Sequence, residues 1–214
     1  MCKWRVWCLI PLLLVGCSQN YSDKKVDQAL AEKKLTPAPR APQQQLPAGH
    51  PQVGEGGRHS LKGVSAILPE GWQQSPPSSS MRVAEYLLPG EAYKAADAGL
   101  AVFYFGRNQG GGLEANIERW YGQFSQPDGG STKERSSRSE REVNGMPVTL
   151  VDIKGTFNSG GMGGGQGAQE GYRMLGGIVQ SPAGSFFFKL TGPEATVEGW
   201  AASFDQYLDS IQPE

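Results

Sequence analysis

Short apolar runs separated by turn-forming residues dominate the chain from residue 61 onward, and this pattern predicts β-strands. The run from Leu100 to Phe105 is almost continuously apolar, which is typical of a strand covered on both faces. Asn144-Gly145 lies between two apolar segments and is a strong hairpin signal. The expected strands cover residues 64–68, 81–88, 99–106, 140–143, 148–157, 172–180 and 184–191.

Two segments change from a period of two to a helical period. In residues 112–124, Leu113, Ile117 and Trp120 recur at helical spacing, with Glu114 and Glu118 on the other side. The second helix follows Pro193 and places a set of apolar side chains on one face: Val197, Trp200, Phe204, Tyr207, Leu208 and Ile211. Hairpin connections predominate, so we expect an α+β fold: a mainly antiparallel sheet of about six or seven strands flanked by two main helices.

The segment before residue 61 has a different composition. Residues 36–60 combine frequent proline with a glutamine run at 43–45 and glycines at 54, 56 and 57. Low apolar content with frequent proline cannot close a hydrophobic core. We therefore predict a lipidated tail and disordered tether over residues 17–60, and one globular domain over residues 61–214.

Residues 1–16 carry a targeting pattern. Lys3 and Arg5 precede an apolar run from Val6 to Val15, which is short against the roughly 20 residues of a spanning helix. Leu14-Val15-Gly16-Cys17 resembles a bacterial lipoprotein signal. That resemblance implies cleavage before Cys17, diacylglycerol attachment to its thiol and acylation of the new terminus, palmitate included. The alternatives are a transmembrane anchor and a plain cleaved signal.

The subcellular location implied by this resemblance is the cell envelope. The acyl chains on Cys17 would hold the protein in a lipid bilayer, facing the periplasm or the outside. Ser18, rather than an aspartate, follows the cysteine and favours the outer membrane by similarity to the enterobacterial sorting pattern.

The domain also resembles a known fold family. Leu68-Pro69-Glu70-Gly71-Trp72, a single helix in mid-sheet and a long final helix resemble the PsbP-like α/β/α sandwich, which Mog-type Ran-binding proteins share. The runs 101–106 and 172–176 resemble those of an uncharacterised group of bacterial lipoproteins. The resemblance implies an α/β/α sandwich over residues 61–212 and brings no activity with it.

Charge and cysteine content exclude several functions. Without residues 1–16 the chain keeps 18 basic and 21 acidic residues, a formal net charge of −3, so we expect no nucleic-acid partner. Cys2 and Cys8 lie in the removed segment and Cys17 carries lipid. The processed protein would have neither a disulfide nor a catalytic thiol.

The remaining candidate catalytic and ligand-binding residues do not predict an enzyme. His50 and His59 fall in or beside the predicted tether, where a general base cannot be held in place; weak metal capture by the pair is the alternative. The glycine-rich stretch Gly160–Gly167 lacks the Lys-Ser/Thr of a phosphate loop, so we interpret it as a hairpin loop or the lip of a binding surface. Carboxylates are scattered over different elements, and we expect no metal and no cofactor.

Arginine is the residue type that suggests a binding site. Arg82, Arg119 and Arg173 lie within predicted elements, and with Asn116 and Tyr172 they form a candidate site for an anion or a carboxylate. Surface salt bridges are the alternative. The aromatic side chains are expected to be core, with an exposed aromatic groove for a partner protein as the alternative reading.

Together these patterns predict a non-enzymatic, membrane-anchored lipoprotein that binds or assembles with an envelope protein partner. Two alternatives stay open. One is an envelope enzyme that uses carboxylates or arginine in a surface cleft. The other is an accessory protein that binds a small molecule or a metal.

Overall fold

The structure is a computed structural model that describes residues 57–158 and 167–214. The chain divides into two units, residues 1–45 and 46–214, and every described residue belongs to the second unit. Cys17, His50 and the glycines at 160–165 lie outside the described residues.

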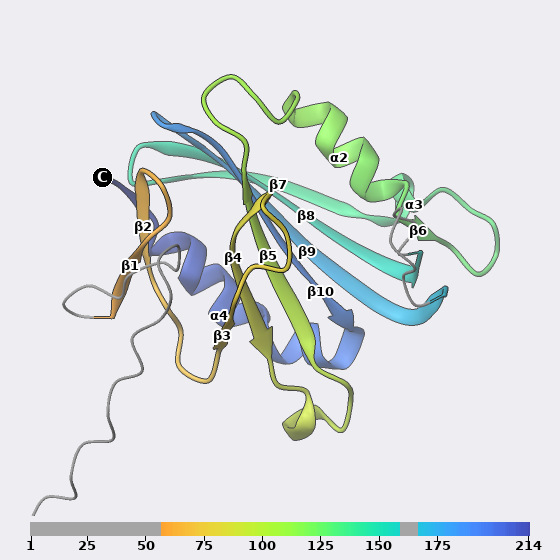
Figure 1. The fold of residues 1–214 in the computed structure, drawn as a ribbon. Coiled ribbons are helices and arrows are strands. Elements are labelled where there is room, and N and C mark those ends of the chain that lie inside the picture. Colours follow the sequence, from red (N-terminus) through yellow and green to blue (C-terminus); the bar gives the residue numbers. More distant parts are fainter. Residues whose placement is uncertain (1–56, 159–166) are drawn as a thin grey trace, which may run out of the picture. The chain divides into compact units, whose positions relative to one another are not determined.

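The domain is built from one large and one small antiparallel sheet (Figure 1). The large sheet has eight strands in the order β3-β4-β5-β10-β9-β8-β6, with β7 also paired to β8. Its strands are β3 (Gln73–Ser75), β4 (Arg82–Leu88), β5 (Ala98–Tyr104), β6 (Phe124–Ser125), β7 (Ser137–Val143), β8 (Met146–Phe157), β9 (Gln169–Ser181) and β10 (Gly184–Pro193). The small sheet has the order β1-β2-β11, from β1 (Arg58–Ser60), β2 (Val64–Ile67) and β11 (Gln212–Pro213).

Three α-helices and one 3-10 helix complete the described part of the chain. They are α2 (Leu113–Tyr121), α3 (Thr132–Arg135), α4 (Glu194–Asp209) and η2 (Glu91–Tyr93). The predicted α+β class and the predominantly antiparallel sheet are therefore confirmed. The large sheet has one strand more than the upper end of the expected range.

Local sequence explains the hairpins. Asn144 and Gly145 have φ angles of 49° and 77°, so both central residues of the β7–β8 turn are left-handed, as a type I′ turn requires. In the β9–β10 turn the Ser181 hydroxyl accepts from the Ala183 backbone N–H at 3.1 Å. Both predicted hairpins are present.

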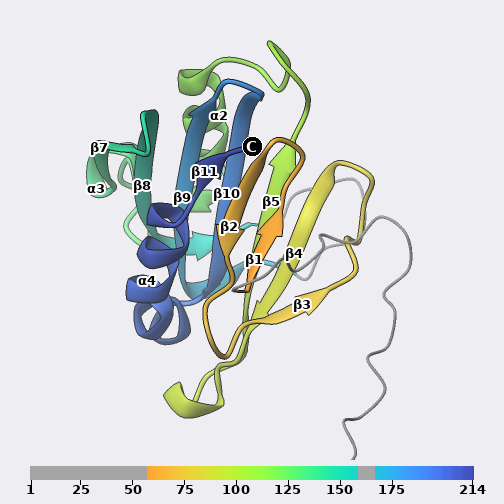
Figure 2. The same ribbon diagram turned by 90° about the vertical axis from the view of Figure 1, so that its left-hand side faces the viewer.

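Side chains alternate between the two faces of the large sheet and make two separate cores. One core joins α4 and the small sheet to strands β4, β5 and β10; it contains Tyr86, Leu100, Phe186, Phe188 and Phe204. The other core joins α2 to β8, β9 and β10; it contains Ile117, Trp120, Ile153, Met174 and Ile178. Figure 2 shows β1, β2 and β11 beside α4 on the first of these faces, which we call the α4 face; the opposite one is the α2 face.

The short elements were not predicted. Strands β1, β3, β6 and β11 have two or three residues each. The segment 126–139, for which no element was predicted, holds α3 and the start of β7. Strand β1 begins at Arg58, three residues before residue 61, where the globular domain was expected to begin.

Within the described part of the chain, no helix combines the length and the apolar character needed to cross a bilayer.

Candidate functional site

The two faces of the large sheet are covered to different extents. On the α2 face the only long cover that the described residues provide is α2, which has nine residues. Its Trp120 ring packs on Gly176 of β9, where an added Cβ would meet ring atoms at 2.5 Å. The part of this face formed by β4, β5 and the far end of β10 lies beyond the helix and contains a pocket.

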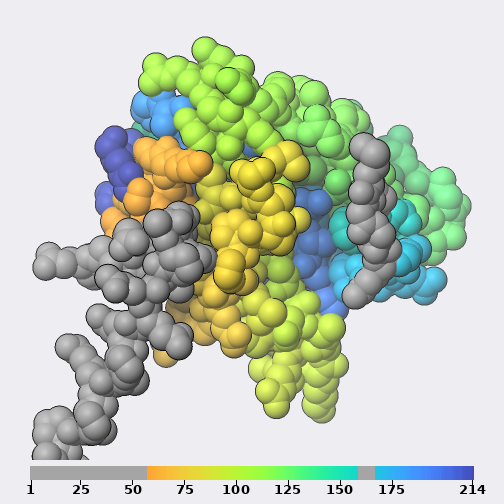
Figure 3. All heavy atoms as spheres, in the orientation of Figure 1, coloured from red at the N-terminus to blue at the C-terminus, as the bar shows by residue number. Residues whose placement is uncertain are grey.

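The pocket has a volume of about 450 Å³ and a floor of small residues. Gly99 and Ala101 of β5 form that floor, and an added Cβ on Gly99 would meet no atom within 4 Å. In Figure 3 the blue atoms of β10 are visible at the surface between the yellow β3–β4 region and the cyan strands. The full lining is Ser75, Arg82, Glu85, Tyr86, Leu87, Asp97, Ala98, Gly99, Leu100, Ala101, Phe103, Phe157, Gln169, Tyr172, Lys189 and Thr191.

Lys189 is the central polar group of the pocket. Strand register places it opposite Ala101, on the same face as Phe187 and Thr191. Its Nζ donates a hydrogen bond to Gln123 Oε1, just beyond α2, and lies 5.3 Å from the centroid of the Phe157 ring. Burial, and after it the positive charge of Arg82, lower the pKa of Lys189 to about 8. Among the described residues, no carboxylate lies within ion-pair distance of this ammonium.

A β-bulge brings Arg82 and Glu85 to the same face. The register of β4 against β5 shifts between Arg82 and Ala84, so two residues three positions apart both point into the pocket. Arg82 forms an ion pair with Glu85, and Arg82 Nη1 also donates to Ser78 Oγ at 2.9 Å. Glu85 accepts from the Ser78 backbone N–H as well. The Glu85 carboxylate is therefore already engaged by groups at the rim.

Aromatic rings form two walls of the pocket. Phe103 carries the Arg82 guanidinium above its ring, with Cζ 5.6 Å from the centroid. Across the pocket, Phe157 and Tyr172 stack nearly parallel, with centroids 6.1 Å apart. A second bulge, between Gly155 and Phe157, aligns Phe157 for this stack. Flat apolar surfaces thus face each other across a small-residue floor.

Two buried polar atoms in this lining have no hydrogen-bond partner among the described residues. They are Nε of Arg82 and Oγ1 of Thr191. Buried polar groups are nearly always hydrogen-bonded, and an unpaired one is costly. Both atoms are themselves buried, so they lie behind the pocket surface rather than on it.

The five predicted binding residues fall into three places. Arg82 and Tyr172 line this pocket. Asn116 is buried at the start of α2, where its side-chain N–H groups donate to the Gly110 and Gly112 carbonyls; it accepts from exposed Arg119 at 2.7 Å. Arg173 points to the α4 face. The structure does not bring the five together in one cluster.

Arg173 shows why neighbours in a strand separate. Tyr172 and Arg173 are consecutive, so they face opposite sides of the sheet. Arg173 makes two 2.8 Å hydrogen bonds to Asp152 and an ion pair with Glu198 of α4. It borders a hollow of about 180 Å³ beside α4, which its partner Asp152 also lines.

Sequence reasoning missed Lys189, although a signal was present. The segment Phe186-Phe187-Phe188-Lys189-Leu190 is a buried strand with a single charge in it. A lysine is rarely fully buried without a partner, so a charge inside such a run deserves a functional hypothesis.

The structure corrects the expectation for His59. It was expected in the tether, but it is only 2% exposed and lies in the α4-face core. Its Nε2 is 2.7 Å from the Tyr86 hydroxyl and 3.0 Å from the Tyr207 hydroxyl. Burial, with a smaller contribution from the positive charge of Arg58, lowers the pKa of His59 to about 4. His59 is enclosed by aromatic rings, which favours a structural role.

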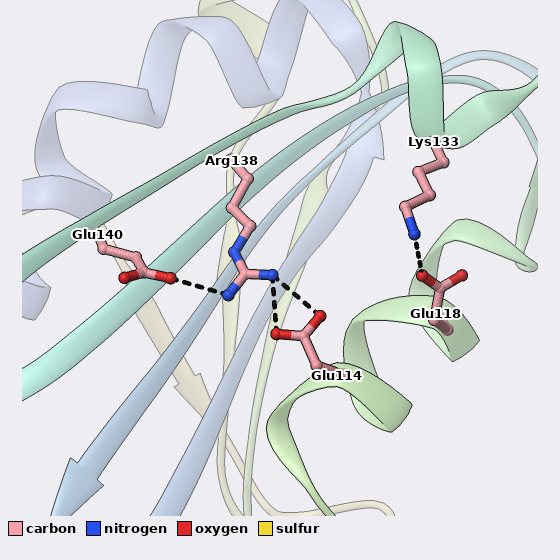
Figure 4. Close-up of polar contacts among 5 residues, drawn as sticks. All are labelled: Glu114, Glu118, Lys133, Arg138 and Glu140. Carbon is pink, nitrogen blue, oxygen red and sulfur yellow. Dashed lines mark hydrogen bonds and ion pairs between the residues drawn. The ribbon is translucent and has the colours of Figure 1, made fainter.

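Helix α2 is connected to the rest of the domain by exposed ion pairs. Arg138 of β7 bonds both oxygens of Glu114 on α2, at 2.9 and 3.0 Å, and bonds Glu140 at 2.8 Å (Figure 4). Lys133 of α3 bonds Glu118 one turn further along α2 at 2.5 Å. These contacts place α2 over β8 and β9 and leave β4 and β5 uncovered. No group of three or more histidine, cysteine, aspartate or glutamate side chains with metal-site geometry occurs in residues 57–158 and 167–214.

Comparisons with known proteins give structural similarity only. No family model matches the chain, and no curated protein matches it. Among solved structures, a Pseudomonas aeruginosa protein of unknown function is 15% identical with a TM-score of 0.41, covering 70% of this chain and 91% of the other.

Two further matches are similarly distant. The solution structure of cyanobacterial PsbP (CyanoP) from Synechocystis is 12% identical, with a TM-score of 0.46, and covers 84% of this chain and 100% of that one. A Bacteroides thetaiotaomicron structure is 11% identical, with a TM-score of 0.40, and covers 71% of this chain and 45% of the other. The α+β sandwich is established by the strand pairing and the two cores, and the resemblance to PsbP-like domains stays a prediction at this level of similarity.

Proposed function

We propose that this protein is a lipid-anchored binding protein of the cell envelope, and that its domain holds a small molecule in the pocket on the α2 face. The observation that carries the pocket assignment is the partially uncovered sheet face. A floor of Gly99 and Ala101, aromatic walls and the polar end of Lys189 are the features of a ligand site.

The residues at the pocket favour binding over catalysis. A general base needs a free acceptor within reach of a substrate proton. Glu85 lines the pocket but already accepts from Ser78 and Arg82, and His59 lies on the other side of the sheet. The pocket residues that stay available are better suited to orienting a ligand.

Binding in the pocket can be tested with a neutral planar probe, 2-naphthamide. In NMR titrations of the full chain we expect saturable shifts of the Gly99, Ala101 and Thr191 amides. Gly99→Leu adds a side chain at a position where a Cβ meets no atom within 4 Å, and it should abolish these shifts because that side chain occupies the ligand volume. Shifts that persist in Gly99→Leu, or that map to the α4 face, would refute the pocket assignment.

The anchor proposal rests on Leu14-Val15-Gly16-Cys17 and is tested separately. Cys17→Ala removes the thiol that would receive the lipid, and the variant should leave the membrane fraction. A conservative control is Cys8→Ala, which alters the removed segment only and should stay with the membrane. If Cys17→Ala stays membrane-bound after a carbonate wash, the anchor assignment is wrong.

A further inference from the structure

We infer that the pocket is selective for a planar apolar anion, such as an aryl carboxylate, whose negative group pairs with Lys189 Nζ. This inference rests on the proposed function and specifies its ligand class. It uses the distribution of charge and the shape of the walls, which are independent of the anchor.

The charged side chains that line the pocket differ in how fully they are bonded within the chain. Its two carboxylates already accept hydrogen bonds from the chain: Glu85 from Ser78 and Arg82, and Asp97 from the Gly90 backbone N–H at 2.8 Å. Lys189 has an amide oxygen as its only hydrogen-bond acceptor in the described chain. Lys189 is therefore the cation of the pocket that has no ion-pair partner among the described residues, whereas Arg82 is paired with Glu85.

The hydrogen-bonding capacity of Lys189 agrees with a negative ligand. An ammonium has three donors and no acceptor, so Lys189 retains donor capacity beyond its bond to Gln123. A carboxylate accepts at both oxygens and is the complementary group for this ammonium.

The walls determine the shape of the remaining part of the ligand. Phe103 on one side and the Phe157–Tyr172 stack on the other present flat apolar surfaces. The Cβ-free floor at Gly99 lets a ring approach the backbone of β5 closely. A fused ring of naphthalene size is well below the pocket volume of about 450 Å³.

The test compares two isosteric probes, 2-naphthoate and 2-naphthamide, by calorimetric titration of the full chain at neutral pH. Lys189→Gln retains a polar side chain beside Gln123 but loses the charge. Because a hydrogen bond to a charged group is stronger than a neutral one, naphthoate should bind about tenfold or more weakly to this variant. Naphthamide affinity should stay within about twofold, since no charge is paired in either protein.

Matched variants separate charge from structure. Lys189→Arg should retain naphthoate binding. Lys154→Gln removes an exposed lysine that pairs with Glu194, and it should leave both affinities unchanged. Equal affinities of the two probes for the wild type, or no effect of Lys189→Gln, would overturn the anion inference and leave the pocket itself supported. Failure of both probes to bind would instead overturn the proposed function.

A pH series gives an independent readout. The lowered pKa of Lys189 predicts that naphthoate affinity declines as pH rises through about 8, while naphthamide affinity stays constant. Arginine and carboxylate charges do not change between pH 7 and 9. Tyr172→Phe should retain this profile, and a profile that depends on Tyr172 or that is flat would contradict the assignment to Lys189. The other titratable or charged groups lining the pocket are Arg82, Glu85, Tyr86, Asp97 and Tyr172.

Discussion

The two faces of the large sheet share the same strands but have different cover. The α4 face is closed by a sixteen-residue helix together with the small sheet, and its aromatic core includes Tyr86, Phe186, Phe188 and Tyr207. The α2 face has a nine-residue helix, so its cover ends before β4 and β5. The comparison indicates that the pocket forms where the cover by α2 ends, above the small residues Gly99 and Ala101 of β5.

The two faces should differ most in how much stability is lost when an aromatic ring is removed. Phe188→Ala, in the fully buried α4-face core, should lower the free energy of unfolding by about 3–5 kcal/mol. Phe103→Ala, at the half-buried pocket wall, should cost about 1–2 kcal/mol, because its ring already borders open space. Urea unfolding measures both, and equal losses would contradict the unequal closure of the two faces.

The second difference is in pH dependence and originates at His59. Its folded-state pKa of about 4 lies below the unfolded value of 6.5, so the unfolded chain binds the proton more readily. The contribution of neutral His59 to the free energy of unfolding is fully present above pH 6.5, declines as pH falls, and is lost by about pH 4. The loss is on the order of 3 kcal/mol.

Urea unfolding of wild type and His59→Gln between pH 4 and 7.5 measures this contribution. The glutamine amide can still bond the tyrosine hydroxyls but does not titrate. Its unfolding free energy should therefore fall less steeply across this window. Parallel pH profiles for the two proteins would place the pH sensitivity elsewhere.

Two glycines test the covered and uncovered parts of the α2 face itself. Gly176→Ala should destabilise by about 1–3 kcal/mol, because its Cβ would meet the Trp120 ring at 2.5 Å. Gly99→Ala meets no atom and should be neutral or stabilise by about 0.4–1 kcal/mol. Thermal unfolding of both variants shows whether each one is stabilised or destabilised. A destabilised Gly99→Ala would mean that the pocket floor is occupied by protein.

The smallest effect is expected at the ion pairs that position α2. Arg138→Gln removes the bonds to Glu114 and Glu140, yet exposed pairs contribute little, so the loss should be below about 1 kcal/mol. Thermal unfolding at low and high salt checks this, since added salt should reduce the difference between the proteins. A loss of several kcal/mol would mean that α2 depends on charge rather than on the packing of Trp120.

The parts of the fold that were predicted correctly depend on local sequence patterns, and the parts that were missed depend on pairing between distant segments. Asn144-Gly145 and the helical spacing in 112–124 depend on neighbouring residues, and both elements are present. Strands of two or three residues, such as β6 and β11, form only because a distant strand pairs with them. They are too short for the alternation of apolar and polar residues to reveal them in the sequence. His59 was misplaced for the same reason: its partners Tyr86 and Tyr207 are far away in the sequence.

The candidate site was partly accessible from sequence. Arg82 and Tyr172 were singled out and line the pocket, but their grouping with Arg173 ignored the alternation of side chains along β9. The bulge that turns Arg82 and Glu85 to one face has no clear sequence signal. Lys189 stands out only once the strand around it is known to be buried.

The central claim is that the uncovered part of the α2 face holds a small ligand. A crystal of the protein soaked with 6-bromo-2-naphthoate tests it most directly, because bromine is located by its anomalous signal. The account predicts one bromine peak between Phe103 and the Phe157–Tyr172 stack, with the carboxylate at Lys189 Nζ. An empty pocket, or a peak on the α4 face alone, would contradict it.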